Sequence, residues 1–206
     1  MARTKLRKFA ELKTFPELFE KPTNLAGTWH DQFGNAAPIT LELGCGEGDY
    51  TIALAQQHPD QNFIGMDIQG ERLWSAAKAA QALGLKNVLW LRAYIDHLSE
   101  YFGSAEISTI WLTFPDPFPR QGKASKRLTS PKFLELYRRI IQPAGELILK
   151  TDDENLFAYS IETVQASAGI ITEQNRSTDF TITSAFERKW LKLGKSVQVL
   201  RWHWPT

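Results

Sequence analysis

The chain has 206 residues, of which 43% are hydrophobic and 23% charged, and its formal net charge is +1. This composition fits one globular domain with a substantial core, and no apolar run reaches the roughly 18 residues that a membrane span needs. The single cysteine, Cys45, excludes an internal disulfide, and the four scattered histidines predict no zinc site. The basic start is not followed by an apolar run, so we expect no secretory signal and a cytoplasmic protein.

The first segment, residues 1–38, is interrupted by Pro16, Pro22, Gly27 and Pro38 and shows no sustained period of apolar residues. Prolines and glycines at such spacing interrupt regular structure. The sequence therefore predicts an irregular, flexible N-terminal lead-in over 1–38, followed by one domain over 39–206.

From residue 39 onward, predicted strands and helices alternate. Short apolar runs predict strands at Ile39–Leu43, Asn62–Met66, Val88–Leu91, Ser108–Phe114, Glu146–Lys150 and, approximately, Ile170–Arg176 and Ser196–Trp202. Helical spacing of apolar residues predicts helices at Asp49–Gln57, Glu71–Leu83, His97–Phe102, Pro131–Ile141 and about Asn155–Ala168. This order predicts an α/β fold, a doubly wound and mostly parallel sheet with helices on both faces. Such sheets bind ligands at the C-terminal ends of their strands.

A glycine-rich loop, Gly44–Gly48, follows the first strand of the predicted domain. Its three alternate glycines let the backbone turn tightly and approach a ligand closely. Asp49 stands where the dinucleotide fingerprint has its third glycine, so an acid would face the pyrophosphate of NAD. S-adenosylmethionine (SAM) has no phosphate and carries an ammonium and a sulfonium. The acids Glu42, Glu47 and Asp49 therefore favour SAM over NAD.

Asp67 ends the second predicted strand. A carboxylate at that position accepts hydrogen bonds from the ribose hydroxyls that SAM and NAD share. A glycine-rich loop alone is equally well explained as a simple turn. The combination of strand, loop, helix and Asp67 predicts a site for a nucleoside cofactor, with Cys45 serving as a small residue between glycines.

The fourth predicted strand leads into Phe114-Pro115-Asp116-Pro117-Phe118-Pro119-Arg120. The prolines on both sides of Asp116 restrict the backbone and hold the carboxylate in one direction. An isolated Pro-Asp-Pro is more often a turn. After the fourth strand of a SAM-binding fold, it resembles the Asp/Asn-Pro-Pro-aromatic element of amino-methyltransferases, in which a polar side chain and a backbone carbonyl hold the target nitrogen.

The longer pattern resembles one family more closely. Phe114–Arg120, followed by Lys126-Arg127-Leu128, is similar to the signature of the tRNA (guanine-N7-)-methyltransferases, which usually have Trp at position 118 and Lys at position 120. Lys150–Asp152 and Ser184–Glu187 are further matches to this family. The chain departs from the family after the third strand. Where Asp or Asn is common near the adenine, this sequence has Ala93-Tyr94, and which of the two contacts the adenine is open.

The resemblance implies methyl transfer from SAM to N7 of a guanine in the tRNA variable loop, giving 7-methylguanosine. It implies that Asp116 is the catalytic residue and holds the N1–H and N2–H edge of the guanine. No base is required, because N7 already has a free lone pair. Cofactor contacts are expected at Glu42, Gly44, Gly46, Asp67, Tyr94 and Asp116. Substrate contacts are implied at Arg120, Asp152, Ser184, Ala185, Phe186 and Glu187.

Basic residues follow the Asp116 segment in sequence. Lys123, Lys126 and Arg127 are predicted to contact tRNA phosphates, although the alternative for any run of charges is a solvated face. Two other functions stay open at this point. One is a SAM enzyme acting on a small molecule or protein, which has no use for the basic run. The other is a non-catalytic RNA-binding subunit, which needs neither the glycine loop nor Asp116. The expected partner is tRNA, with no membrane and no metal, and the chain is a monomer or homodimer.

Overall fold

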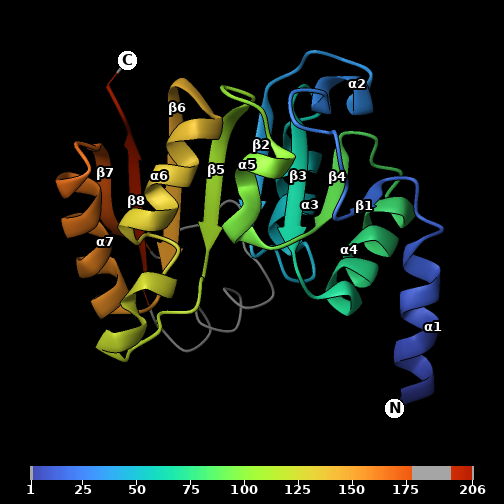
Figure 1. Cartoon of the computed structure of the whole chain (residues 1–206), viewed down its shortest axis with the longest axis horizontal. Coiled ribbons are helices and arrows are strands. Elements are labelled where there is room, and N and C mark those ends of the chain that lie inside the picture. Colours follow the sequence, from blue (N-terminus) through green and yellow to red (C-terminus); the bar gives the residue numbers. More distant parts are fainter. Residues whose placement is uncertain (1, 178–195, 206) are drawn as a thin grey trace.

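The computed structural model describes residues 2–177 and 196–205, with side chains over 7–175 and 196–205. Within these residues, eight strands form one sheet in the order β1-β4-β3-β2-β5-β6-β8-β7 (Figure 1). The strands are β1 Leu18–Glu20, β2 Ile39–Leu43, β3 Asn62–Asp67, β4 Val88–Arg92, β5 Ile107–Thr113, β6 Ile141–Thr151, β7 Ile170–Ser177 and β8 Val197–His203. Strand β8 is antiparallel to both neighbours, and the other pairs are parallel.

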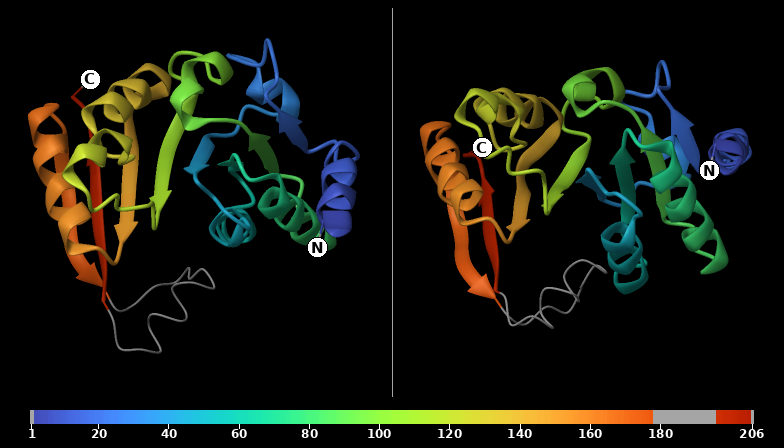
Figure 2. Two further views of the ribbon diagram at one scale, coloured as in Figure 1. Left: turned by 60° about the horizontal axis from the view of Figure 1, so that its bottom comes forward. Right: turned by 90° about the horizontal axis from the view of Figure 1, so that it is seen from below.

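Helices cover both faces of the sheet (Figure 2). They are α1 Ala2–Leu12, α2 Trp29–Phe33, α3 Asp49–Gln57, α4 Gly70–Ala82, α5 Leu98–Tyr101, α6 Pro131–Ile140 and α7 Glu154–Ala166, with 3₁₀ turns η1 Ile95–His97 and η2 Gln121–Lys126. Helices α3 and α4 lie on one face, and α5, α6 and α7 lie on the other. The predicted doubly wound, mostly parallel fold is confirmed. None of the helices in the described part of the chain is long and apolar enough to cross a membrane.

The core is divided by the sheet into two apolar layers. Because the central strands are buried on both faces, most of their residues are apolar, as is typical of parallel sheets. On the α3 and α4 side, the indole of Trp90 packs directly over Gly65, where an added Cβ would lie 2.4 Å from the indole ring. An added Cβ on Gly48 would also lie 2.4 Å from this ring. Trp90 therefore ties the backbone of the glycine loop to the middle of the sheet.

The predicted elements from residue 39 onward are confirmed, with small differences at their ends. Ile39–Leu43 and Asp49–Gln57 have the predicted bounds. Strand β5 ends one residue earlier than predicted, because Phe114 has a φ of +48° and leaves the strand conformation. Strand β6 begins earlier than predicted, at Ile141, with an irregularity in its pairing with β5.

The prediction that residues 1–38 are irregular is wrong for α1, β1 and α2. Strand β1 pairs in parallel with β4 and extends the sheet. The side chain of Trp29 is fully buried, and its Nε1 donates to the carbonyl of Tyr101 at 2.8 Å. The carboxylate of Glu106 accepts hydrogen bonds from the amides of Gly27 at 2.8 Å and Trp29 at 2.9 Å. These contacts join residues more than 70 positions apart, which local sequence patterns do not reveal.

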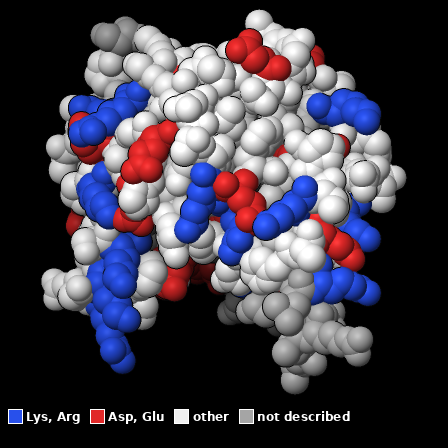
Figure 3. Space-filling view, turned by 45° about the vertical axis from the view of Figure 1, so that its right-hand side comes forward, with Lys and Arg blue, Asp and Glu red and all other residues white. Residues whose placement is uncertain are grey.

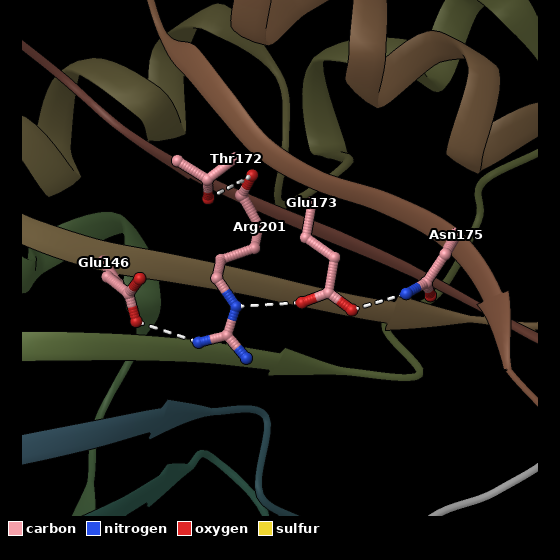
Figure 4. A network of polar contacts seen from close by, with 5 residues as sticks. All are labelled: Glu146, Thr172, Glu173, Asn175 and Arg201. Atoms are coloured by element: carbon pink, nitrogen blue, oxygen red, sulfur yellow. Dashed lines mark hydrogen bonds and ion pairs between the residues drawn. The ribbon is translucent and has the colours of Figure 1, made fainter.

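The last three strands are joined by a polar network (Figure 4). The guanidinium of Arg201, on β8, lies between Glu146 of β6 at 2.8 Å and Glu173 of β7 at 3.1 Å. Asn175 donates to the other oxygen of Glu173, and the hydroxyl of Thr172 donates to the carbonyl of Arg201. Strand β8 runs antiparallel to β6, so the end of β8 that carries Arg201 lies toward the N-terminal part of β6. The network is therefore away from the edge where the parallel strands end.

Candidate active site

A cavity of about 640 Å³ opens where β2, β3, β4 and β5 end. This volume is in the usual range for small-molecule and cofactor sites. Segments that are far apart in the sequence contribute its walls. The lining residues are Leu43, Gly44, Asp67, Ile68, Gln69, Arg72, Ala93, Tyr94, Ile95, Asp96, Phe114, Pro115, Asp116, Phe118, Ser125, Lys126, Leu128, Lys132 and Phe133.

The glycine loop is held against the end of β3. The amides of Gly44 and Cys45 both donate to the carbonyl of Met66, at 2.8 and 3.0 Å. Gly44 has a φ of +76°, and a Cβ there would meet nothing within 4 Å, so its backbone is open to a ligand. The amide of Gly46 donates to Asp67 Oδ2 at 3.0 Å, although Gly46 itself does not line the cavity. The loop therefore helps to fix the Asp67 carboxylate.

Asp67 is nearly buried and is oriented by backbone amides. Besides the contact from Gly46, its Oδ1 accepts a hydrogen bond from the amide of Gln69 at 2.8 Å. A carboxylate oxygen can accept more than one hydrogen bond, so both oxygens keep acceptor capacity toward the cavity. The nearby lining of Ile68 and Ile95 is apolar. The Asp67 carboxylate suits a ribose, and the apolar wall suits an adenine.

These residues fit SAM. Two carboxylates line this part of the cavity, Asp67 beside the glycine loop and Asp116 beyond the end of β5. Their negative charges are compatible with the positive charges of SAM. Ala93 and Tyr94 both line the cavity, and Tyr94 is 51% exposed, with the ammonium of Lys21 lying 5.2 Å from its ring centroid. Of these two residues, Tyr94 has the more exposed side chain, since Ala93 is only 1% exposed.

Glu42 lies in a different environment from the one predicted. It is 2% exposed and does not line the cavity. Its carboxylate accepts hydrogen bonds from the amide and hydroxyl of Thr51 and from the hydroxyl of Thr113. Burial raises the pKa of Glu42 to about 7, although these hydrogen bonds oppose the rise. Glu42 joins β2, α3 and β5 behind the glycine loop, and its direct contact with SAM stays a prediction.

Cys45 is also buried beside the cavity, within the glycine loop. Burial, with a smaller contribution from the carboxylates of Glu42 and Asp67, raises the pKa of its thiol well above the usual value. A thiol with a raised pKa is a poor nucleophile, because the thiolate is the reactive form. The geometry favours the interpretation of Cys45 as a small residue that fits between glycines.

The segment Phe114–Phe118, named here the reaction loop, connects β5 to the mouth of the cavity. Two of its non-glycine residues have left-handed backbone angles, with φ +48° at Phe114 and +40° at Phe118. The amide of Phe114 donates to the carbonyl of Lys150 at 2.8 Å. Asp116 lines the cavity, and its Oδ1 accepts a hydrogen bond from the amide of Phe118 at 2.9 Å. The loop thus presents an exposed carboxylate whose direction is fixed.

The basic residues after the reaction loop do not all occupy similar positions. Lys126 lines the cavity, whereas Arg120 and Lys123 are exposed outside it. Arg127 donates to two carbonyls of the reaction loop, at 3.0 and 3.2 Å. Figure 3 shows Lys and Arg side chains gathered on the lower left of the molecule, beside a hollow at its lower edge. The predicted phosphate contacts therefore divide into exposed, cavity-lining and loop-binding residues.

Of the remaining predicted substrate residues, only Asp152 is among the residues that the structure describes. Asp152 is half-buried at the end of β6 and does not line it. Ser184, Ala185, Phe186 and Glu187 lie outside the described residues.

The cavity wall also contains an ion pair that the sequence did not indicate. Lys132, in the first turn of α6, pairs with Asp96 of η1, and both side chains line the cavity. Nothing in the local sequence marks this pair, since 36 positions separate the two residues. Across residues 2–177 and 196–205, no three His, Cys, Asp or Glu side chains are grouped so that they could hold a metal ion.

Comparison with known proteins identifies close relatives. Residues 36–200 match the protein family described as "Putative methyltransferase". The tRNA (guanine-N(7)-)-methyltransferase of Bacteroides thetaiotaomicron is 40% identical over 222 residues, an alignment that covers 100% of this chain and 87% of the relative. The tRNA (guanine-N(7)-)-methyltransferase of Christiangramia forsetii is 36% identical and covers 97% of each chain. Among solved structures, the 16S rRNA methyltransferase KamB superimposes with a TM-score of 0.70 at 15% identity, covering 92% of this chain and 99% of KamB, which supports the fold.

Proposed function

This chain belongs to the tRNA (guanine-N(7)-)-methyltransferase family, and on that premise we propose that it uses SAM to methylate N7 of a guanine in the variable loop of tRNA, giving 7-methylguanosine. One observation carries the proposal. Gly44 after β2, Asp67 at the end of β3 and Asp116 in the loop after β5 line a single cavity. Residues suited to a nucleoside cofactor therefore lie beside the residue expected to hold the target base, as a direct transfer requires.

SAM, when bound, supplies a methyl group activated by its sulfonium. We assign its ribose to Asp67, whose carboxylate is fixed by the amides of Gly46 and Gln69. The open backbone at Gly44 and the carboxylate of Asp116 would hold the methionine part. Tyr94 and the neighbouring lining would cover the adenine. Hydrogen bonds already present in the protein orient Asp67 before SAM binds, which lowers the cost of ordering the site.

The guanine would be held by Asp116. Its carboxylate can accept hydrogen bonds from both N1–H and N2–H of the base, since one oxygen keeps a second lone pair after the contact with Phe118. The same negative charge stabilises the positive charge that develops on the ring during transfer. N7 has a free lone pair at neutral pH, and the described cavity lining includes neither His nor Cys. The proposed catalysis is therefore alignment and charge stabilisation, without proton abstraction.

The substrate polynucleotide would contact the surface beside the cavity. Lys126 in the wall, with Arg120 and Lys123 outside it, supplies positive charge for phosphates near the target base. Arg120, Asp152 and the segment 184–187 are proposed substrate contacts through the family resemblance. We also propose that residues 39–206 carry the methyltransferase chemistry and that β1 and α2 of the preceding segment complete the same domain. We propose that the enzyme acts in the cytoplasm, where tRNA is available, as a monomer or homodimer.

The direct test is to incubate the protein with labelled SAM and bulk tRNA, digest the RNA to nucleosides and identify the labelled product. We expect 7-methylguanosine. A labelled product at another position or on another molecule supports a different SAM enzyme. No labelled product, with tRNA bound, supports the non-catalytic RNA-binding alternative.

The role of Asp116 is tested by single-turnover rates of Asp116→Ala and Asp116→Asn. Both should lose at least about 100-fold, the size found when one stabilising group of a transition state is removed. Asp60→Asn is a matched control, because Asp60 is exposed at the opposite end of the sheet, before β3. Near-normal transfer by either Asp116 variant contradicts the assigned role.

A further inference from the structure

Arg127 is the residue that follows η2, and its guanidinium contacts the reaction loop directly. Its Nε donates to the carbonyl of Pro117 at 3.0 Å, and its Nη2 donates to the carbonyl of Phe118 at 3.2 Å. The same group lies over the ring of Tyr159 on α7, with Cζ 4.4 Å from the ring centroid. Arg127 therefore joins three separate parts of the structure: the reaction loop, η2 and α7.

The contacted backbone needs such support. Phe118 has a φ of +40°, a conformation that non-glycine residues keep only where surrounding contacts hold it. Its amide donates to Asp116 Oδ1, and its carbonyl accepts from Arg127. Both polar groups of Phe118 are thus fixed, one by the proposed catalytic carboxylate and the other by Arg127. A shift of the Phe118 peptide would move Asp116 with it.

We infer that Arg127 is a positioning residue, which holds the carbonyls of Pro117 and Phe118 so that the Asp116 carboxylate keeps its direction into the cavity. This inference rests on the proposed function and replaces the predicted phosphate contact of Arg127, while the predicted phosphate contact of Lys126 is retained. The chemistry requires arginine. A planar guanidinium can donate to two neighbouring carbonyls and stack on an aromatic ring at once, whereas an ammonium offers no such flat fork.

The two roles of Arg127 make different predictions for Arg127→Lys, which preserves the charge. For a phosphate contact, this variant should retain both rate and tRNA affinity. For a positioning residue, the single-turnover rate at saturating tRNA and SAM should fall by roughly 100-fold, as expected for a small displacement of a catalytic group. The dissociation constant for tRNA, and its dependence on salt concentration, should stay within about twofold of wild type, since the charge on which they depend is unchanged.

A matched control is available in Arg138→Lys. Arg138, on α6, also stacks on an aromatic ring, with Cζ 4.9 Å from the Trp204 centroid, and its Nη2 donates to the carbonyl of Ser167. It does not line the cavity. This variant should keep the wild-type rate. Lys126→Ala is the contrasting variant, since loss of a phosphate contact should weaken tRNA binding and reduce the salt slope by about 1.

Two further measurements separate positioning from general stability. Guanidinium ion at low concentration should partly restore the single-turnover rate of Arg127→Ala, an effect that a merely structural role does not produce. Tyr159→Leu removes the stacking partner and keeps Arg127. It should lower the single-turnover rate by about tenfold with unchanged tRNA affinity. If Arg127→Lys does not fold, this variant alone tests whether Arg127 is a positioning residue.

The inference is overturned if Arg127→Lys transfers methyl at the wild-type rate, or if its loss is entirely in tRNA affinity. Failure of wild type to form 7-methylguanosine is a different result, because it refutes the proposed function itself.

Discussion

Glu42 is a buried carboxyl group whose ionisation should measurably affect stability. It is 2% exposed, and burial raises its pKa from 4.5 to about 7. We predict that Glu42→Gln removes a pH dependence from the free energy of unfolding. The amide of glutamine can preserve the network, since its oxygen accepts from Thr51 while its nitrogen donates to the hydroxyl of Thr113.

The direction and size follow from linkage. Because the folded pKa of Glu42 is raised, the native state binds this proton more tightly than the unfolded chain. The resulting stability is fully present below about pH 4.5 and is lost as pH rises to about 7. A rise in pKa from 4.5 to about 7 corresponds to about 3 kcal/mol. Above pH 7, Glu42→Gln should therefore be more stable than wild type by about 2 to 3 kcal/mol.

The assay is denaturant unfolding of both proteins without SAM, at several pH values from about 5 to about 8.5. The difference between the two free energies of unfolding isolates this one group, since all other titrations are shared. It should change by about 2 to 3 kcal/mol over this range and level off above pH 7. A constant difference would refute the argument, because it would mean that Glu42 is ionised throughout.

Three further predictions follow from other contacts. Gly48→Ala should lower the free energy of unfolding by about 1–3 kcal/mol, measured by denaturant unfolding, because a Cβ there would lie 2.4 Å from Trp90. Gly84→Ala is the control, because Gly84 shares the left-handed φ of Gly48 but a Cβ there would meet nothing within 4 Å. Glu106→Ala should lower it by at least about 3 kcal/mol, because three backbone amides lose a charged acceptor, and an unchanged midpoint would contradict the anchoring of residues 27–29. Asp67→Asn should weaken SAM binding at least about tenfold, measured by calorimetry. The asparagine side chain has one acceptor oxygen, so it cannot accept from both backbone amides that now contact Asp67 and also from the ribose hydroxyls. Equal affinity would contradict the assignment of the ribose to Asp67.

The alternation of strands and helices after residue 39 could be predicted because each element is marked locally. The strand Ile39–Leu43 is a continuous apolar run, and the helix Asp49–Gln57 has apolar spacing between a glycine and a proline. The N-terminal elements lack this support. Strand β1 has three residues and is defined by its pairing with β4, far along the chain. Helix α1 did have a signal, since Leu6, Phe9 and Leu12 recur at helical spacing, but Pro16 and Pro22 interrupt regular structure soon after this short pattern.

The candidate site was predictable to the extent that its residues follow strand ends. Gly44 follows β2, Asp67 ends β3 and Asp116 lies in the loop after β5. The C-terminal ends of these parallel strands share one edge of the sheet, so the three residues line one cavity. Residues defined by a partner elsewhere were not predictable. Neither the burial of Glu42 behind the loop nor the pairing of Asp96 with Lys132 can be read from neighbouring residues, because both depend on how α3, α6 and η1 pack.

The location of backbone strain supports a mechanism of positioning. The two non-glycine residues with left-handed angles in the reaction loop, Phe114 and Phe118, stand on either side of Asp116. Such conformations persist only where other contacts impose them, and here the contacts come from the carbonyl of Lys150 and the guanidinium of Arg127. A site that removed a proton would need, besides a well-placed group, a base of suitable pKa. Methylation at N7 needs no base, so its rate depends on holding the guanine in line with the methyl group, and a rigidly held carboxylate serves that need directly.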